Sequence, residues 1–437
     1  MNRQKNGKKL VVIGCGSAYT PEIFDGIISH SKVLNITNIT LVDIDEGLDR
    51  AKIILAFGER MFRKRGIPCE LTLTTNRRNA LKDTDFVISQ IRVGRTDARI
   101  KDETIGLETG IIGQETTGAG GFMNAMRTVP TAIQIAKDIE EICPNAWLIN
   151  FTNPSGIITE AILKHTKVKC VGLCNVPVNM QTDAARVMDA DFHNLHCSFV
   201  GLNHLSYMVG VELGGENVLD TVVEKISNNE TLMKNIPKVA GVGALIKTIG
   251  IVPSPYLQYY YFENEMLKKQ QDEYKQHGKT RGSLVDEIDH VLFEKYSNEQ
   301  LDEKPVELSQ RGGSLYSYAA LNAIEALSSD TPAEMVLNVM NNGAVADLEN
   351  DDVVEINCMV SKNGVKPLPY GTLPDTARGL IQTIKQYERL TIQAAVSGDK
   401  ITALNALLNH PLIHGYNNAR QIIAKMQKEF SEFIKLN

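Results

Sequence analysis

The first residues whose types and spacing indicate a chemical function are two glycines in a turn and an aspartate further along the chain. Gly14 and Gly16, with Ser17 after them, stand directly behind an apolar run. Such a turn lets the backbone approach a pyrophosphate, whose charge the start of the next helix favours. Asp43 ends the next apolar run; its carboxylate can accept bonds from a ribose diol and would repel a 2′-phosphate, which favours NAD over NADP. Because Tyr19 stands where a third glycine is expected, an α/β domain with a plain tight turn is the alternative.

Cys174 and His204 are candidate ligands of a metal ion. Cys174 follows the apolar run 168–173, at the edge of the predicted sheet where the cofactor would bind, and His204 lies between two predicted strands. Taken singly, the cysteine is accounted for by packing and the histidine by a hydrogen bond at the surface. A site with two protein ligands leaves positions open for substrate oxygens, as a catalytic metal requires.

Three arginines follow the fourth predicted strand. They are Arg92, Arg95 and Arg99, and two acids, Asp102 and Glu103, come just after them. Two interpretations are equally open. One arginine pairs with these acids, or several arginines hold an anionic substrate, because guanidinium matches phosphate oxygens in a bidentate manner.

An aromatic stretch covers residues 255–261 and contains four tyrosines, most of which we assign to helix packing. Tyr256, the first of them, is a candidate general base. A tyrosine is a competent base only where a nearby cation lowers its pKa from about 10. Arg281 and a metal ion are the candidates for that cation.

These residues need an architecture that brings them together. Apolar runs that predict strands alternate with helical patterns in the first half, at 9–13, 23–28, 39–42, 53–61, 71–74, 78–81, 86–90, 123–142, 147–150, 157–163 and 168–173. Strands at this spacing imply right-handed crossovers and a doubly wound sheet. Polar residues cluster where the strands end, which is where an open α/β sheet binds ligands.

The pattern changes near residue 195. A hairpin is predicted around Asn203 and His204, together with one later strand and three helix-rich stretches, at 197–201, 208–212, 353–360, 255–300, 313–329 and 376–435. The predicted fold class is α/β. Residues 1–195 form a Rossmann-like doubly wound sheet that binds NAD, and residues 196–437 form a mixed α+β, helix-rich domain for substrate binding and oligomerisation.

Composition excludes several classes of protein. The 437 residues are 43% hydrophobic and 22% charged, which excludes disorder, collagen and coiled coil. The net charge of −6 argues against nucleic acid as a partner, and no apolar run approaches the length of a membrane span. Only four apolar residues precede Gly14, too few for a secretory signal. Seven cysteines without a C-x-x-C pair suit reduced thiols, so we expect a cytoplasmic protein.

At these residues the sequence resembles glycoside hydrolase family 4, the NAD- and metal-dependent glycosidases. The resembling segments follow one another in the family's order over most of the chain: 12–21, 91–94, 113–118, 150–154, 174–177, 201–204 and 311–313. Within this family the absent third glycine is the usual pattern. The resemblance therefore supports the dinucleotide turn that the generic motif alone leaves open.

The resemblance implies a role for each matching residue. Cys174 and His204 would hold a divalent metal, usually manganese, although a thiolate ligand by its softness would favour zinc. Tyr256 would be the base, and the substrate contacts would be Arg99, Asn153, Asn175 and Arg281. Asn175 follows the metal cysteine, where α-specific members carry Asp or His, so the chain is most similar to the 6-phospho-β-glucosidases.

The implied reaction is hydrolysis of a phosphorylated β-glucoside such as cellobiose 6-phosphate. It proceeds by oxidation at C3, deprotonation at C2, elimination of the aglycone, water addition and re-reduction, outside the usual two-carboxylate scheme. Asn175 cannot donate a proton as an acid would, so the group that protonates the leaving aglycone stays open. The alternatives are a 6-phospho-α-glucosidase or another glycosidase of the same family, a dehydrogenase of the lactate or malate type, and a silent NAD or sugar-phosphate sensor. Homodimer and homotetramer are both open.

Overall fold

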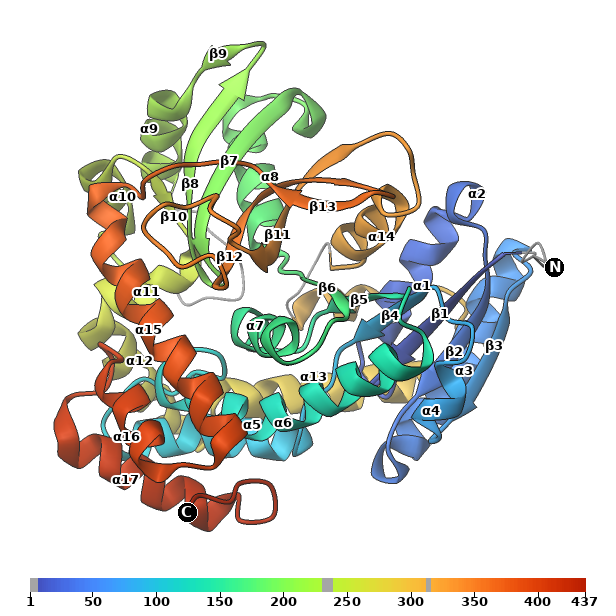
Figure 1. Ribbon diagram of the computed structural model, residues 1–437, viewed down its shortest axis with the longest axis horizontal. Helices are drawn as coiled ribbons and strands as arrows, with labels where there is room; N and C mark the ends of the chain where they lie inside the picture. The colour runs from blue at the N-terminus through green and yellow to red at the C-terminus, as the bar shows by residue number, and fades with distance from the viewer. Residues whose placement is uncertain (1–6, 230–238, 312–315) are drawn as a thin grey trace.

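A computed structural model describes residues 7–229, 239–311 and 316–437, and the predicted residues 312 and 313 lie outside them. One mixed sheet runs through the whole molecule, in the order β10-β8-β7-β12-β11-β6-β5-β4-β1-β2-β3 (Figure 1). β9 (Glu216–Asn217) and β13 (Gly364–Pro367) are short additions that pair with β8 and β12. Every other element is arranged around this sheet.

Six parallel strands form the N-terminal half of the sheet. They are β1 (Lys8–Ile13), β2 (Ile36–Val42), β3 (Glu70–Thr74), β4 (Phe86–Ser89), β5 (Trp147–Asn150) and β6 (Lys169–Gly172). In the central strand β1 the side chains from Leu10 onward are apolar on both faces because helices cover both faces, and Leu10, Val11 and Val12 are fully buried. The predicted doubly wound sheet is confirmed.

Right-handed crossovers distribute the helices over the two faces. The chain moves outward from β1 through β2 to β3, then returns past β1 to β4, β5 and β6, so helices of the two series lie on opposite faces. α1 (Thr20–Ser29) packs on α3 (Leu48–Arg65), and α6 (Gly118–Ile142) packs on α7 (Ser155–His165). Short helices α2 (Ser31–Leu34) and α4 (Arg77–Ala80) and the turn η1 (Asp45–Gly47) complete this half, with α5 (Arg95–Glu108) beside α6.

The sheet continues as antiparallel strands beyond β6. β11 (Ala333–Met340) joins β6 through the pair Asn338 and Gly172, and β12 (Val353–Ser361) lies between β11 and β7 (Leu195–Leu202). β7 and β8 (Leu205–Leu213) are the predicted hairpin, and β10 (Val252–Pro253) pairs with β8. The division of the chain at residue 195 stays a prediction, since one sheet crosses that position.

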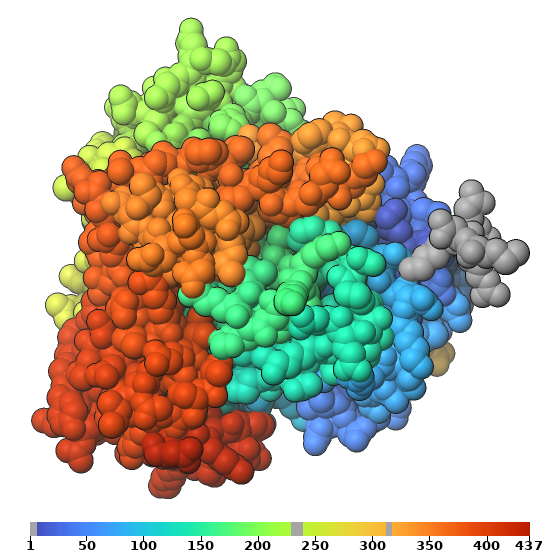
Figure 2. Space-filling view, viewed as in Figure 1, coloured from blue at the N-terminus to red at the C-terminus, as the bar shows by residue number. Residues whose placement is uncertain are grey.

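The remaining helices include three that the sequence analysis did not predict, α8 to α10, and others that lie in the predicted helix-rich stretches. They are α8 (Val176–Met188), α9 (Leu219–Asn229), α10 (Val242–Ile249), α11 (Gln258–Tyr261), α12 (Glu263–His277), α13 (Arg281–Ser297), α14 (Tyr316–Ala326), α15 (Asp375–Ser397), α16 (Lys400–Leu408) and α17 (Gly415–Glu429), with the single turns η2 (Phe192–Asn194), η3 (Pro255–Leu257) and η4 (Val306–Gln310). α15 packs against α6 and α7, so the C-terminal helices lie directly against the first half (Figure 2). Within the described ranges, no helix combines the length and apolar character needed to cross a bilayer.

The start of one helix and the presence of one strand are clear differences from the sequence prediction. α6 begins at Gly118, five residues before the predicted start, because its glycine-rich first turn packs against the preceding loop. Strand β11 was not predicted at all. Its residues include good helix formers, and its strand conformation depends on partners far away in the sequence.

Candidate active site

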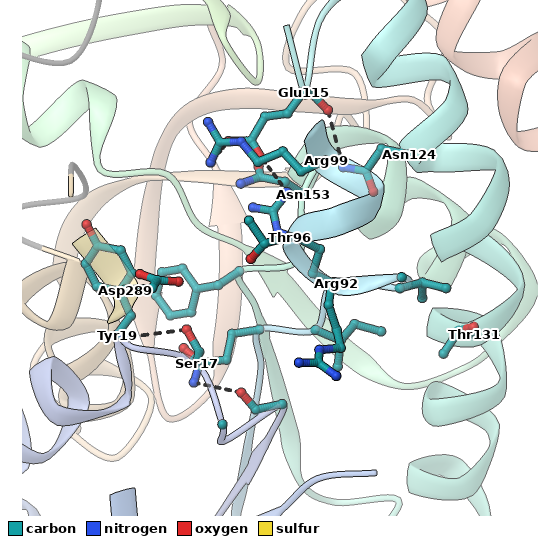
Figure 3. Close-up of a pocket in the computed structure, with 18 of the residues that line it drawn as sticks. Ser17, Tyr19, Arg92, Thr96, Arg99, Glu115, Asn124, Thr131, Asn153 and Asp289 are labelled. Atoms are coloured by element: carbon teal, nitrogen blue, oxygen red, sulfur yellow. Dashed lines mark hydrogen bonds and ion pairs between the residues drawn. The ribbon is translucent and has the colours of Figure 1, made fainter. Parts of the chain in front are cut away.

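One cavity of about 610 Å³ opens where the parallel strands end. It brings together every residue that the sequence analysis proposed for cofactor, metal, substrate and base: Gly14, Gly16, Ser17, Asp43, Arg99, Asn153, Cys174, Asn175, His204, Tyr256 and Arg281. Figure 3 shows Ser17, Arg99, Asn153 and other side chains around this cavity. Residues more than 200 positions apart in the chain therefore share one site.

The glycine turn connects β1 to α1 at the edge of the cavity. Gly14 has a φ of 83°, and its N–H donates to the carbonyl of Val42 over 2.9 Å. A Cβ on Gly14 would lie 3.0 Å from the carbonyl oxygen of Gln90, so the turn leaves no room for a side chain there. Because no side chain projects from the turn at Gly14, a pyrophosphate can approach the backbone at the N-terminus of α1.

Tyr19 takes the place of the expected third glycine without strain. Its φ of −85° and ψ of −12° are helical values that any residue adopts. The guanidinium of Arg311 lies over its ring, 4.7 Å from the centroid, and Arg311 also pairs with Asp289. In this chain the position serves side-chain packing, which is why the generic fingerprint is incomplete.

Asp43 holds the glycine turn in place as well as lining the cavity. Its Oδ2 accepts the N–H of Gly16 at 2.5 Å, and its Oδ1 accepts the N–H of Ile44 at 2.9 Å. A carboxylate oxygen can accept more than one hydrogen bond, so these contacts leave capacity for ribose hydroxyls. The predicted link between the turn and the acid is a direct contact.

A partly buried carboxylate lies among the arginines. Glu115 forms ion pairs with Arg92 and with Nη1 of Arg99, the latter at 3.0 Å (Figure 3). Burial raises the pKa of Glu115, but the guanidinium groups of Arg92 and Arg99 outweigh it and lower that pKa to about 2. The carboxylate is therefore ionised and offsets part of the positive charge.

Arg99 pairs with one of the two acids, as one interpretation predicted, while its binding of an anionic substrate stays a prediction. Its Nε donates to Oε1 of Glu103 at 2.9 Å, while the residue also lines the cavity. Glu103 accepts the N–H of Gly282 at 2.6 Å as well. Arg281 begins α13, next to Gly282, so this acid connects the two predicted substrate arginines.

Asn153 and Asn175 stand at the ends of neighbouring strands. Asn153 follows β5 and is joined to Pro154 by a cis peptide bond. Asn175 follows β6 and caps α8, where its carbonyl accepts the N–H of Asn179 at 3.0 Å. Both residues line the cavity, at the sheet edge where ligands bind in this architecture.

Cys174 and His204 reach the cavity from separate strands. Cys174 follows β6, and its Sγ accepts the N–H of Val176 at 3.5 Å. His204 lies in the two-residue turn of the β7–β8 hairpin and has a φ of 63°. Burial lowers the pKa of His204 to about 4, so its imidazole is neutral, and burial raises the pKa of the Cys174 thiol.

These two side chains suit a divalent metal. A neutral imidazole is a metal ligand, and a thiol becomes one by losing its proton to the solvent when the metal binds. No group of three or more His, Cys, Asp or Glu side chains within the described residues is arranged to hold a metal. A metal at Cys174 and His204 would thus keep positions open for ligands from outside the chain.

Tyr256 lies against His204. The two rings are stacked, with centroids 3.8 Å apart and planes within 5° of parallel. Burial raises the pKa of Tyr256, and the positive charge with the largest opposing effect is that of Arg99. The sequence analysis named Arg281 for this purpose, but the structure gives Arg99 the larger influence.

Comparison with known proteins identifies the family. Residues 9–190 match the description "Family 4 glycosyl hydrolase", and residues 199–413 match "Family 4 glycosyl hydrolase C-terminal domain". The chain is 42% identical over 431 residues to the "Probable 6-phospho-beta-glucosidase" of Bacillus subtilis. The aligned residues cover 98% of this chain and 97% of that protein. The chain belongs to family 4 of the glycosyl hydrolases.

Two further relatives agree with this assignment. The "6-phospho-beta-glucosidase" of Escherichia coli is 39% identical over 426 residues, 96% of this chain and 94% of that protein. The 6-phospho-β-glucosidase of Thermotoga maritima, whose structure was solved with manganese, NAD⁺ and glucose-6-phosphate, superposes with a TM-score of 0.88 at 35% identity. That match covers 98% of this chain and 100% of the other.

Sequence reasoning missed several residues of this glycosyl hydrolase site. Glu115 lies in the matching segment 113–118 but has no predicted role of its own, although it is the carboxylate that offsets Arg92 and Arg99. Gln114 and Tyr259 also line the cavity. The glycine-rich stretch around residues 113–121 was the available signal, because close backbone packing beside a predicted sheet edge marks a loop that approaches a ligand.

Proposed function

We propose that this family 4 glycosyl hydrolase cleaves 6-phospho-β-glucosides, such as cellobiose 6-phosphate, with NAD and a divalent metal, manganese by preference. The observation that carries the proposal is the single cavity, which joins a dinucleotide turn to Cys174, His204 and Tyr256. Relatives that are 42% and 39% identical bear the names probable 6-phospho-β-glucosidase and 6-phospho-β-glucosidase, and the Thermotoga maritima relative was solved with manganese and NAD⁺. When bound, NAD⁺ supplies a hydride acceptor and the metal supplies a Lewis acid.

The chain's own residues would bind the cofactor and the substrate. Gly14, Gly16 and Ser17 would admit the pyrophosphate of the cofactor, and Asp43 would accept the ribose hydroxyls. The glucoside and its phosphate would bind to one cluster of polar side chains: Arg99, Asn153, Asn175 and Arg281. Since two of these are arginines, an anionic substrate is favoured over a neutral glucoside.

Tyr256 would remove the proton from C2 of the sugar. A ketone at C3 makes that proton acidic, and Arg99 provides the positive charge that opposes the effect of burial on the phenol. Cys174 and His204 would hold the metal beside the same carbon atoms. Asn175 offers no acidic proton, so leaving-group protonation falls to water or to another group.

The decisive assay supplies p-nitrophenyl β-glucoside 6-phosphate with NAD⁺ and Mn²⁺ under reducing conditions. We expect p-nitrophenol to be released without net formation of NADH, because the hydride returns in each turnover. Stoichiometric NADH would indicate a dehydrogenase of the lactate or malate type. Binding without release of p-nitrophenol would indicate a sensor, and faster release from the α-anomer would indicate a 6-phospho-α-glucosidase.

We also propose that the enzyme works in the cytoplasm as a homodimer or homotetramer. All seven cysteines are free in the structure, as a reducing compartment allows. Light scattering coupled to size-exclusion chromatography measures the mass of the assembly. A mass equal to that of one 48.3 kDa chain would contradict the oligomer.

A further inference from the structure

A short chain of hydrogen bonds leads from Gln114 through Thr116 to His204. Thr116 Oγ1 lies 3.0 Å from Nδ1 of His204 and 2.9 Å from Oε1 of Gln114. The same Oε1 accepts the backbone N–H of Thr116 at 2.6 Å. Gln114 and His204 are both buried, so these groups satisfy one another.

The number of N–H and O–H protons determines which group donates and which accepts in each of these hydrogen bonds. A backbone N–H can only donate, so the Gln114 atom that it meets is the carbonyl oxygen and not the amide nitrogen. That oxygen can only accept, so the Thr116 hydroxyl donates its single proton to it. Thr116 Oγ1 then meets His204 with a lone pair, and Nδ1 of His204 must be the donor.

We infer that Gln114 and Thr116 are positioning residues that fix His204 in the tautomer with its proton on Nδ1, which leaves the Nε2 lone pair for the divalent metal. The inference rests on the proposed function only where it names the metal. A second group that holds the distal N–H of a histidine sets which nitrogen binds a metal. Within the described part of the chain, Nε2 of His204 has no hydrogen-bond partner.

Two further contacts restrict the same histidine. The ring of Tyr256 is stacked on the imidazole and limits its plane. Beneath the loop, a Cβ on Gly120 would lie 2.1 Å from the carbonyl oxygen of Gln114, so the loop rests on the first turn of α6. Only glycine allows this approach, and the backbone that carries Gln114 and Thr116 is thereby held against a long helix.

The same loop also places Glu115 between Arg92 and Arg99. Successive side chains of one turn therefore reach the metal ligand and the arginines. A change in the conformation of this loop would disturb both at once. Substitutions that remove only the hydroxyl of Thr116 separate the two effects, since they leave the loop backbone and Glu115 in place.

Histidine tautomers can be read in the metal-free protein by long-range ¹H–¹⁵N NMR after selective ¹⁵N-histidine labelling. The signals of His204 are assigned by their loss in His204→Gln. We expect Nδ1 to be protonated in the wild type and a mixture of tautomers in Thr116→Val. A wild-type protein with the proton on Nε2 of His204 would overturn the inference.

Metal affinity gives the second readout, measured by titrating Mn²⁺ and following the free ion by electron paramagnetic resonance. Thr116→Val should weaken Mn²⁺ binding by about 10- to 100-fold, the range found when outer partners of a ligand are removed. Thr116→Ser retains the hydroxyl and should bind Mn²⁺ like the wild type. Thr117→Val is the matched control, because Thr117 hydrogen-bonds Tyr260 instead of His204.

The outcomes separate this inference from the proposed function. Unchanged tautomer and unchanged Mn²⁺ affinity in a folded Thr116→Val protein would overturn the inference, with folding checked by the thermal midpoint and by NAD⁺ binding. Equal losses in Thr116→Val and Thr116→Ser would also overturn it, since the hydroxyl would not be the cause. A wild-type protein with the expected tautomer that binds no Mn²⁺ would instead contradict the metal dependence of the proposed function.

Discussion

The two walls of the cavity are built in different ways. The wall beside β1 and β2 contains the main chain of the glycine turn, in which the N–H of Gly16 donates to Asp43 and the N–H of Gly14 donates to the carbonyl of Val42. The opposite wall consists of side chains from separate segments, namely Cys174 after β6, His204 in a hairpin and Tyr256 in a helical turn. The first wall needs one turn and the neighbouring strand β2, whereas the second needs segments from across the sheet to assemble.

This difference predicts how substitutions on the two walls will act. A main-chain wall tolerates most side-chain changes and mainly determines how tightly a cofactor binds. A wall of converging side chains carries proton transfer and metal binding, where the loss of one atom removes a chemical function. Changes on the second wall should therefore reduce turnover far more than changes on the first.

The largest effect is expected at Tyr256. Tyr256→Phe keeps the ring that stacks on His204 but removes the phenolic oxygen, so turnover should fall by ~10²–10⁴-fold with near-native stability. Steady-state kinetics and thermal unfolding measure the two quantities. Exchange of deuterium from C2 of the substrate into solvent should disappear in the same variant.

Tyr259→Phe is the matched control for this change. Tyr259 lines the same cavity, and its ring centroid lies 6.2 Å from that of Tyr256. The positive charge of Arg99 acts to lower the pKa of both tyrosines, so the two substitutions remove comparable phenols. Turnover should fall less than in Tyr256→Phe. A larger loss in Tyr259→Phe would make Tyr259 the base and would contradict the role given to Tyr256.

The next effect concerns the metal ligands. Cys174→Ser and His204→Ala should each reduce activity about 10²-fold through weaker metal binding, and chelation of the wild type should abolish activity until Mn²⁺ is restored. Mn²⁺ titrations and assays before and after chelation provide the measurement. Cys170→Ser is the control, because Cys170 lies buried in β6 away from the cavity. Full activity of a chelated sample would exclude the metal.

The contrast between the walls also explains what the sequence could reveal. The parallel strands and the glycine turn are local patterns, such as the apolar run that becomes β1 and ends at Gly14. The residue types and spacing suggested the candidates on the second wall, the family resemblance implied a role for each, and the structure places all of them in one cavity. Their individual roles stay predictions until they are measured.

Other features depend on contacts that no local pattern encodes. The strand β11 contains Ala333, Glu334 and Met335, which favour helix in isolation, but it pairs along its length with β12. The position of Glu115 between Arg92 and Arg99 depends on how a loop folds against α6. Tertiary contacts decide both, so they could not be predicted from propensity or spacing.

A smaller effect is expected on the first wall. Asp43→Ala removes the acceptor of the Gly16 N–H and the predicted acceptor of the ribose hydroxyls, so the Kd of NAD⁺ should rise about tenfold while kcat at saturating NAD⁺ changes little. The preference for NAD⁺ over NADP⁺ should also fall. Asp45→Ala, an exposed acid two residues away, is the control. A loss of kcat as large as that of Tyr256→Phe would contradict the division between the walls.

The smallest effect is expected at Thr280, which lies on neither wall but caps the helix that begins with Arg281, a residue that lines the cavity. Its side chain caps α13 by accepting the N–H of Ser283 at 3.4 Å, and Arg281 is the first residue of that helix. Loss of such a cap costs ~1 kcal/mol, so Thr280→Ala should lower the free energy of unfolding by about that amount in urea titrations. Thr280→Ser keeps the hydroxyl and should restore it. Because Arg281 would contact only the substrate, KM should rise slightly while kcat holds, and a fall in kcat without a change in KM would show that α13 takes part in the chemical step.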